Sequence, residues 1–374
     1  MEHYLIYILP GLFGFFLLIQ LYYFLFVYRR LRKFKVAELD QPFNYPPLSV
    51  IICARNEEAN LKLYLSEILE QDYPTYEVVV VNDCSNDDTN WVLKEFQLRY
   101  KHLRIVDIAE HNRFRHGKKF AVTLGVKAAQ YEKLVFTDAD CFPQSDKWLQ
   151  YMGQQFREGI EIVLGYSPYT SGKGFLNKYI RFETFQTALL YLSFALKRNA
   201  YMGVGRNLAY TKSLFFRGKG FASHMHIPSG DDDLFVNQNA TKSNVAICIH
   251  PEAFVWSNPK TSYSSYQRQK KRHFGAGKAY KTKHKRALGI QAFSGVMFYL
   301  LVALLLIVQP YFWYIAVGGY VLRLLLQFLI YIPVMKKLQV AALIAWIPVM
   351  DIAYFLYISC MGLLIPFRKD TQWK

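Results

Sequence analysis

The chain has 374 residues, of which 52% are hydrophobic and 17% aromatic, and its formal net charge is +17. The hydrophobic excess gathers at the two ends, which excludes an ordinary soluble protein and leaves room between them for one large or two small domains. The positive charge gathers in the acid-free stretch from Gln267 to Arg286, which lies beside an apolar run. Attraction to anionic lipid explains this stretch better than nucleic-acid binding does. The sequence contains no signature of a nucleic-acid-binding module, and we expect no nucleic-acid partner.

The first part of the chain is predicted to anchor it in a membrane. Tyr4 to Tyr28 form an almost wholly apolar run of about 25 residues, longer than the roughly 20 that a helix needs to cross a bilayer. A cleaved signal peptide would begin with basic residues, and Met1 to His3 supply none. The bases from Arg29 to Lys35 follow directly and predict a cytoplasmic side there, with the N-terminus outside. Residues 1–35 are therefore expected to form a retained transmembrane anchor.

The last part, residues 288–374, is predicted to hold two or three further spans. Its apolar stretches run from Ile290 to Gln309, from Phe312 to Met335 and from Val340 to Leu364. Arg323 and Asp351 lie inside the second and third stretches. Because an isolated charge in lipid is costly, we expect these two side chains to pair.

Four crossings in total are expected, although they do not place every basic residue on the cytoplasmic side. They put Lys336 and Lys337 inside but leave the bases from Arg368 to Lys374 outside, unless a C-terminal stretch is re-entrant. Either arrangement leaves a cytoplasmic domain at residues 48–287, joined to the anchor by a linker at residues 36–47 that contains three prolines.

The central domain is predicted to begin with alternating strands and helices. Strands are expected at Leu48 to Cys53, Tyr76 to Val81 and Leu103 to Ile108, because these runs are apolar and rich in β-branched residues. Helical spacing follows the first two, at Glu58 to Gln71 and at Thr89 to Tyr100. This alternation predicts an α/β fold with a mostly parallel sheet and helices on both faces.

A further apolar run, Leu134 to Phe136, leads into two acids, Asp138 and Asp140. If the chain stays extended, the two carboxylates point to the same side and can hold one Mg²⁺ or Mn²⁺ ion. Ligands of parallel sheets bind beyond the carboxyl ends of the strands, where Glu57 and Asp83 also follow strands. We therefore expect the four acids to converge on a nucleotide.

Four motifs carry a family resemblance. They are CARNEEANL (Cys53 to Leu61), VNDCSNDDT (Val81 to Thr89), GKKFAVTLG (Gly117 to Gly125) and TDADC (Thr137 to Cys141). In order and spacing they resemble the motifs of membrane-bound family 2 glycosyltransferases of the GT-A fold. The resemblance implies a nucleotide-sugar donor, in the first instance a UDP-sugar, a divalent cation and inversion at the anomeric carbon.

The resemblance also assigns roles to single residues. It implies that Ala54, Arg55 and Glu57 border the nucleoside, that Asp83 holds the base or ribose, that Lys118 lies near the donor, and that Asp138 lies beside the nucleotide with Asp140 as the chief metal ligand.

The second half is expected to supply the acceptor side. The segment Met202 to Asn207 resembles the family's small-residue loop under the acceptor, ahead of a helix from Thr211. Asp231 stands where the family has a Glu-Asp pair, with Gly230 in place of the glutamate. A carboxylate must take the proton of the attacking hydroxyl, so we expect Asp231 to be the base, with Asp232 close behind it. The alternative for Asp232 is an acidic helix cap.

The segment from Gln269 to His273 resembles the Gln-x-x-Arg-Trp motif of processive members. It implies that Gln269 and Arg272 contact the donor, with the fork of Arg272 on the diphosphate. His273 stands in place of the tryptophan and argues against polymer synthesis. The alternative is that this segment is only part of the basic stretch beside the membrane.

Taken together, the sequence predicts a multi-pass enzyme, in a bacterial inner membrane, that transfers a sugar to a lipid-linked or saccharide acceptor. Two other hypotheses remain open: a processive polysaccharide synthase, and a membrane scaffold with an inactive transferase fold.

Overall fold

The computed structural model describes residues 6–40, 43–109 and 117–364, without the side chains of residues 273, 274 and 362–364. The expectations for the side chain of His273 and for the bases from Arg368 to Lys374 lie outside this part. Contacts divide the chain into two units. We call them the sheet unit and the helical unit. Of the described residues, the sheet unit holds residues 35–40, 43–109, 117–184 and 194–280, and the helical unit holds residues 6–34, 185–193 and 281–364.

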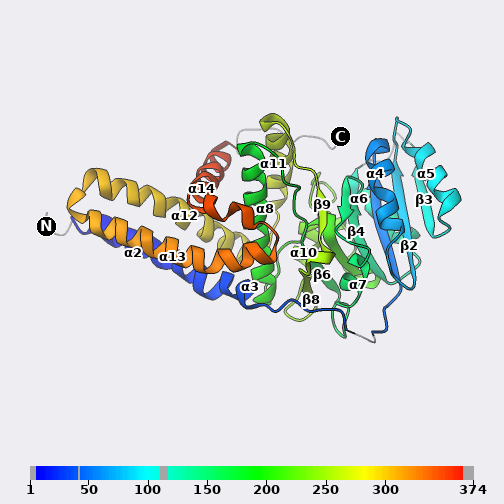
Figure 1. Ribbon diagram of the computed structural model, residues 1–374, viewed down its shortest axis with the longest axis horizontal. Helices are drawn as coiled ribbons and strands as arrows, with labels where there is room; N and C mark the ends of the chain where they lie inside the picture. The colour runs from blue at the N-terminus through cyan, green and yellow to red at the C-terminus, as the bar shows by residue number, and fades with distance from the viewer. Residues whose placement is uncertain (1–5, 41–42, 110–116, 365–374) are drawn as a thin grey trace. The chain divides into compact units, whose positions relative to one another are not determined.

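The sheet unit is built on a seven-stranded sheet with the order β3-β2-β1-β4-β7-β6-β8 (Figure 1). Its strands are β1 (Leu48–Ala54), β2 (Tyr76–Asp83), β3 (Leu103–Ile108), β4 (Lys133–Asp138), β6 (Ile162–Gly165), β7 (Leu208–Thr211) and β8 (Val245–Cys248). The first four strands are parallel, and β7 runs antiparallel to both of its neighbours. A separate two-stranded sheet pairs β5 (Cys141–Pro143) with β9 (Val255–Ser257).

Helices cover the sheet because its central strands are apolar on both faces. The helices of this unit are α4 (Glu58–Leu69), α5 (Thr89–Arg99), α6 (Lys118–Ala128), α7 (Trp148–Gly153), α9 (Lys212–Arg217), α10 (Asp233–Asn239) and α11 (Tyr263–Gly277). In β2, Val79 and Val81 pack with Ala121 of α6. A Cβ added to Gly125 of α6 would lie 2.7 Å from Ile51 Cγ2, so glycine allows α6 to approach β1 closely.

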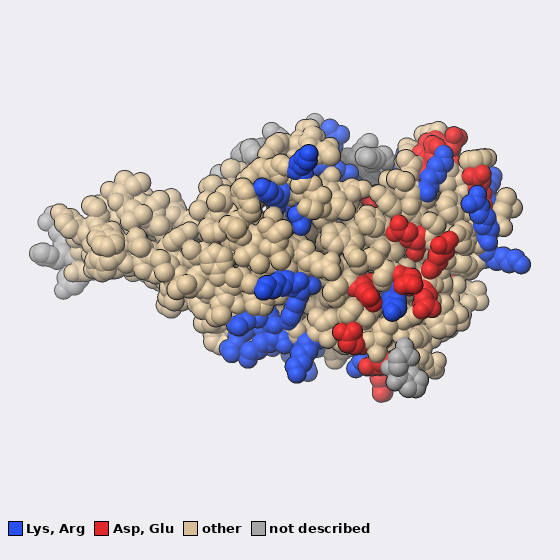
Figure 2. Space-filling view, in the orientation of Figure 1, with Lys and Arg blue, Asp and Glu red and all other residues tan. Residues whose placement is uncertain are grey.

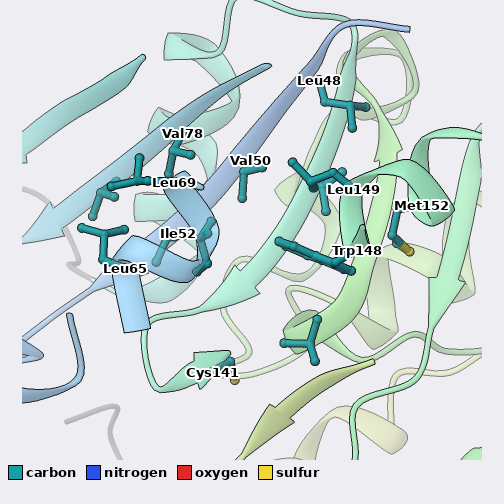
Figure 3. Close-up of a cluster of buried hydrophobic side chains, with 14 of the residues drawn as sticks. Leu48, Val50, Ile52, Leu65, Leu69, Val78, Cys141, Trp148, Leu149 and Met152 are labelled. Carbon is teal, nitrogen blue, oxygen red and sulfur yellow. The ribbon is translucent and has the colours of Figure 1, made fainter. Parts of the chain in front are cut away.

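The opposite face of β2 contributes to the larger core. Val78 and Val80 belong to a buried cluster with Leu65 of α4 and Trp148 of α7 (Figure 3). Side chains alternate along a strand, so a run of four valines fills both layers. The predicted fold class, an α/β fold with a mostly parallel sheet, is confirmed.

The helix predicted from Thr211 is confirmed to within one residue. A strand that was not predicted, β7 (Leu208–Thr211), lies between it and the loop from Met202 to Asn207. The helix α9 then begins at Lys212, with the Thr211 side chain accepting a hydrogen bond from the Leu214 backbone N–H as its N-cap. This antiparallel strand places the loop at the edge of the sheet where β4 ends.

The helical unit contains four helices that are long and apolar enough to cross a membrane, which span Ile8–Lys33, Thr282–Val308, Pro310–Lys337 and Ala341–Met361. They comprise α2 (Ile8–Tyr22), a π-helical turn (Tyr23–Tyr28), α3 (Arg29–Lys33), α12 (Thr282–Val308), α13 (Trp313–Lys337) and α14 (Ile347–Leu364). The middle of α8 (Phe175–Leu196), residues 185–193, also belongs to this unit.

Charges inside the helical unit are paired, as the sequence predicts. Arg323 Nη2 of α13 lies 2.9 Å from Asp351 Oδ2 of α14, and both side chains are buried. Gln186 of α8 donates to the other oxygen of Asp351 at 3.2 Å, and Arg323 also donates to Gln20 Oε1 of α2. This polar network ties four helices together.

Candidate active site

The two acids of the Asp-x-Asp motif converge, although not for the reason that the sequence suggests. β4 ends at Asp138 and the chain turns before Cys141, so Asp140 is not part of an extended strand. Ligand atoms of Asp138, Asp140 and Cys141 nevertheless lie within 4.8 Å of one another. Burial and the neighbouring Asp140 raise the pKa of the Cys141 thiol well above its ordinary value, so the carboxylates are the available ligands. Two carboxylates fit a hard divalent cation.

Lys118 joins this pair to the acids of the second half. It opens α6, and its Nζ lies 2.8 Å from Asp138 Oδ1 and 3.2 Å from Asp231 Oδ2. Burial alone would lower the pKa of Lys118, but Asp138, Asp231 and Asp232 raise it well above its ordinary value. Lys118 is therefore a fixed positive charge between two carboxylates.

Asp138 stays ionised in this setting. Burial would raise the pKa of its carboxyl, but the charges of Lys118, Arg206 and Arg272 hold that pKa below its ordinary value. A carboxylate ligand for a cation must be deprotonated, so these three bases keep Asp138 ready to bind one.

The three acids at Asp231 to Asp233 have different partners. Asp232 caps α10: its two carboxylate oxygens accept the backbone N–H groups of Gly205 and Asp233, each at 2.7 Å. Asp233 accepts from the Leu234 N–H and, at 2.7 Å, from the Tyr280 hydroxyl. Burial, together with the adjacent acid in each case, raises the pKa of Asp232 and of Asp233. Asp231 is the acid of this group that contacts Lys118 at the cavity.

Gly230 has a structural reason to replace the family's glutamate. Its φ of +92° lies in the left-handed region, and an added Cβ would lie 2.5 Å from Leu234 Cδ1. Any side chain here would have a strained backbone and would have to displace the side chain of Leu234. The acid that faces the cavity is therefore the next one, Asp231.

The residues predicted to bind the nucleoside lie in two loops that hold each other. Ala54 ends β1 opposite Asn82, and Asp83 ends β2 fully buried. The Asn56 backbone N–H donates to Ser85 Oγ at 2.9 Å, and the Glu57 N–H donates to Thr89 Oγ1 at 2.9 Å. These bonds fix the Arg55 to Glu57 loop against the turn after Asp83, beside the end of β4. The predicted convergence of the Glu57 carboxylate with the Asp-x-Asp acids stays a prediction.

The predicted donor residues on α11 lie next to the same site. Gln269 Nε2 donates to the Tyr169 hydroxyl at 3.3 Å. The backbone carbonyl of Arg272 accepts from Ser229 Oγ at 2.9 Å, which ties α11 to the loop that carries Asp231. The positive charge of Arg272 also helps to lower the pKa of Asp138.

Two basic residues of the site were not predicted from the sequence. The Lys119 ammonium is buried and donates to the carbonyls of His224 and Ile227, at 2.6 and 3.0 Å, so it holds the loop that precedes Asp231. The Arg206 guanidinium stacks on Tyr169. Arg206 lies in the loop from Met202 to Asn207, and a single arginine between Gly205 and Asn207 is its only signal in the sequence.

A small cavity lies at the centre of this arrangement. Apolar side chains of β1, β4 and α6, among them Ile51, Phe136 and Val122, form part of its lining. The ionisable and hydroxyl-bearing side chains that line it include Lys118, Thr137, Asp138, Asp231 and Asp232. The cavity thus brings the carboxylate of Asp138, the fixed ammonium of Lys118 and the separate carboxylate of Asp231 around one space.

Comparison with known proteins finds similarity in sequence and in fold. Residues 49–218 match the sequence model of the glycosyl transferase family 2. A segment of 151 residues is 30% identical to the 4,4'-diaponeurosporenoate glycosyltransferase of Staphylococcus aureus (strain USA300), covering 40% of this chain and 38% of that protein. The chain thus spans less than two fifths of the length of this relative.

A solved structure resembles most of the chain in fold. It is the mannosyltransferase PcManGT from Pyrobaculum calidifontis in complex with GDP-Man and Mn²⁺, with a TM-score of 0.58, 19% identity, and coverage of 94% of this chain and 99% of that one. The predicted GT-A fold with flanking apolar helices is confirmed. Residues 49–218 of this chain are thus similar to glycosyl transferase family 2.

Proposed function

We propose that this protein transfers a sugar from a nucleotide-sugar donor to a hydroxyl of a lipid-linked or saccharide acceptor, with inversion at the anomeric carbon. The observation that carries the proposal is the bridge from Asp138 through Lys118 to Asp231. It brings an anion-binding ammonium and a candidate base, from distant parts of the chain, to one cavity.

Asp231 is proposed as the base. It takes the proton from the acceptor hydroxyl as the oxygen attacks the anomeric carbon, a role typically worth about 10² to 10⁴ in rate. Asp232 has both oxygens engaged by backbone N–H groups, which suits a cap better than a base. Lys118 stabilises the negative charge of the departing diphosphate from the side of Asp138.

Asp138 and Asp140 are proposed to hold a Mg²⁺ or Mn²⁺ ion. Such an ion, when bound, neutralises charge on the leaving diphosphate. Support comes from the convergence of the two carboxylates and from the Mn²⁺ and GDP-Man in the PcManGT complex. We expect the loops at Arg55 and Asp83 to determine which nucleotide base the site accepts. A UDP-sugar is our first candidate for the donor.

The helical unit is proposed to span a bacterial inner membrane four times, with its basic end in the cytoplasm. The Tyr23 hydroxyl bonds the Ala287 carbonyl and the Lys337 ammonium bonds the Arg32 carbonyl, each at 2.6 Å, so the end of α3, the start of α12 and the end of α13 share one end of the unit. Exposed bases at this end are Arg29, Arg30, Lys33, Lys281, Lys283, Lys285, Arg286 and Lys336. Figure 2 shows Lys and Arg side chains gathered near α3 and the rest of the helices largely uncharged on this face. This asymmetry supports a cytoplasmic basic end.

A nucleotide-sugar screen tests the proposal. Purified full-length protein in detergent is titrated with UDP-, GDP- and CMP-sugars in Mn²⁺, and the sugar that binds is then incubated with membrane lipid extracts while nucleotide release is followed. We expect release that requires both acceptor and cation and that Asp231→Asn abolishes. A protein that binds no nucleotide sugar would instead be a scaffold with this fold.

A further inference from the structure

Arg206 is held in an unusually fixed position beside the site. It lies in a short 3₁₀ turn, Gly205–Asn207, whose neighbours on both sides are engaged. The Gly205 backbone N–H donates to Asp232. The Asn207 side chain, fully buried, accepts from Trp148 Nε1 at 3.1 Å and donates to the Tyr166 carbonyl at 2.9 Å. The backbone of Arg206 therefore has little freedom.

The side chain of Arg206 is fixed as well. The guanidinium carbon lies 4.2 Å from the ring centre of Tyr169, a cation–π contact that sets the plane of the fork. Nη2 donates to the Ser167 carbonyl at 3.2 Å. Tyr169 is itself held by Gln269 of α11, through its hydroxyl. Such pre-organisation reduces the entropy that an arginine loses when it binds an anion.

One nitrogen of this fixed fork has no partner. Nη1 of Arg206 is buried, and the described part of the protein offers it no hydrogen-bond acceptor. Buried polar groups are almost always paired, so an orphan nitrogen at a site needs an explanation. The positive charge acts on both Asp138 and Asp140, yet among the described residues neither carboxylate forms an ion pair with Arg206. The guanidinium is thus close to the cation-binding acids without being neutralised by a direct contact.

We propose that Arg206 binds the diphosphate of the nucleotide-sugar donor, with Nη1 donating to a phosphate oxygen. This inference rests on the proposed function and adds a residue to it. A guanidinium fork matches phosphate geometry, and its bonds to phosphate are charge-assisted. Arg206 and Lys118 then act on the same ligand from separate elements, because Gly205, next to Arg206 in the chain, lines the same cavity as Lys118.

The proposal predicts effects of opposite sign on two ligands. Arg206 repels a divalent cation at Asp138 and Asp140 but attracts a diphosphate. Removing its charge therefore weakens nucleotide binding and leaves the binding of the cation alone unchanged or stronger. Loss of a residue that only supported the fold would instead weaken the binding of both the nucleotide and the cation.

The test is calorimetric titration of the purified full-length protein with UDP and GDP, with uridine and guanosine, and with Mn²⁺ alone. The variants are Arg206→Gln, Arg206→Lys, and the matched control Arg217→Gln, whose arginine forms an exposed ion pair with Glu161 in the same unit. In Arg206→Gln we expect the Kd of the nucleoside diphosphate to rise about 10- to 100-fold and that of the nucleoside to stay constant. The Kd of the nucleoside diphosphate for Arg206→Lys should lie between those of Arg206→Gln and the wild type. The Kd for the control Arg217→Gln should equal that of the wild type.

The other outcomes overturn the inference in distinguishable ways. If the wild type binds a nucleoside diphosphate and Arg206→Gln binds it equally well, Arg206 is not a donor ligand, while the proposed function stands. If Arg206→Gln binds both the nucleoside and Mn²⁺ more weakly and has a lower melting temperature, Arg206 has a structural role and does not bind the donor. A wild type that binds no nucleoside diphosphate would remove both proposals.

Discussion

The Nζ atom of Lys118 lies 2.8 Å from Oδ1 of Asp138, a contact that links the start of α6 to the end of β4. Lys118 also reaches Asp231, which belongs to a loop more than ninety residues further along the chain. Three segments of the sequence thus meet at one ammonium group. The partial burial of all three side chains makes their interaction stronger than that of a surface ion pair.

Replacing Lys118 by methionine should therefore reduce sugar transfer by about 10²-fold, because the diphosphate loses a charged partner. Lys118→Arg keeps the charge and should retain part of the activity. Lys94→Met, at an exposed lysine of α5, is the control. Transfer measured as nucleotide release checks the prediction, and wild-type release by Lys118→Met would contradict the role of Lys118.

Asp231→Asn should lose transfer activity, whereas Asp232→Asn should lose stability. Without the proposed base, Asp231→Asn should lose about 10² to 10⁴ in transfer rate and still bind the donor. Asp232→Asn replaces an oxygen that accepts a backbone N–H, so it should lower stability by about 1 kcal/mol. Single-turnover transfer and thermal unfolding separate the two effects. A stable, inactive Asp232→Asn beside an active Asp231→Asn would reverse the assignment.

The first half of the fold was predictable because its signals are local. Runs such as Val78 to Val81 are long, β-branched and followed by helical spacing, and the observed strand and helix ends lie within two residues of the predicted ones. The strands of the second half were missed. β7 has four residues, Leu208 to Thr211, and pairs in an antiparallel direction with partners distant in sequence. Its pattern does not differ from that of a loop before a helix.

The site was predictable by residue type but not by geometry. Asp138 and Asp140 were identified as a pair, yet a turn, not an extended strand, brings them together. Arg206 lies in the segment from Met202 to Asn207, which was predicted to serve the acceptor, and becomes a candidate donor ligand only through its stacking on Tyr169, from another segment. Contacts of this kind depend on tertiary packing, and a single sequence does not encode them in any local pattern.

The pairing of Arg323 with Asp351 makes a prediction about stability. Arg323→Leu leaves a buried carboxylate without its counter-ion and should cost about 3 to 5 kcal/mol. The double variant Arg323→Met with Asp351→Leu should recover much of that loss, because two apolar side chains then fill the space. Arg30→Leu, at an exposed base of the helical unit, is the control. Thermal unfolding in detergent measures all of these; equal stability of Arg323→Leu and the wild type would contradict the structural role of the pair.

Acid should destabilise the sheet unit through His224. Burial, followed by the charge of Lys119, lowers the pKa of this histidine to about 4, from an ordinary value of 6.5. Between these two pH values the unfolded chain binds a proton that the folded one excludes, so stability is lost as pH falls from 6.5 toward 4, by about 2 kcal/mol.

His224→Gln should flatten this pH dependence, whereas His226→Gln, at the exposed histidine two positions away, should leave it unchanged. Unfolding by urea at pH 7 and pH 5 provides the comparison. If His224→Gln and the wild type lose the same stability on acidification, another group is responsible.

The account depends most on the claim that Asp138 and Asp140 hold a cation that serves the sugar donor. The measurement that tests it most directly is sugar transfer by the wild type and by Asp140→Asn as Mn²⁺ is titrated into chelator-treated protein. We predict that the wild type is inactive without the ion and recovers with it, while Asp140→Asn stays at least about 10²-fold slower at saturating Mn²⁺. Transfer by Asp140→Asn at the wild-type rate, or full activity in chelator, would contradict the account.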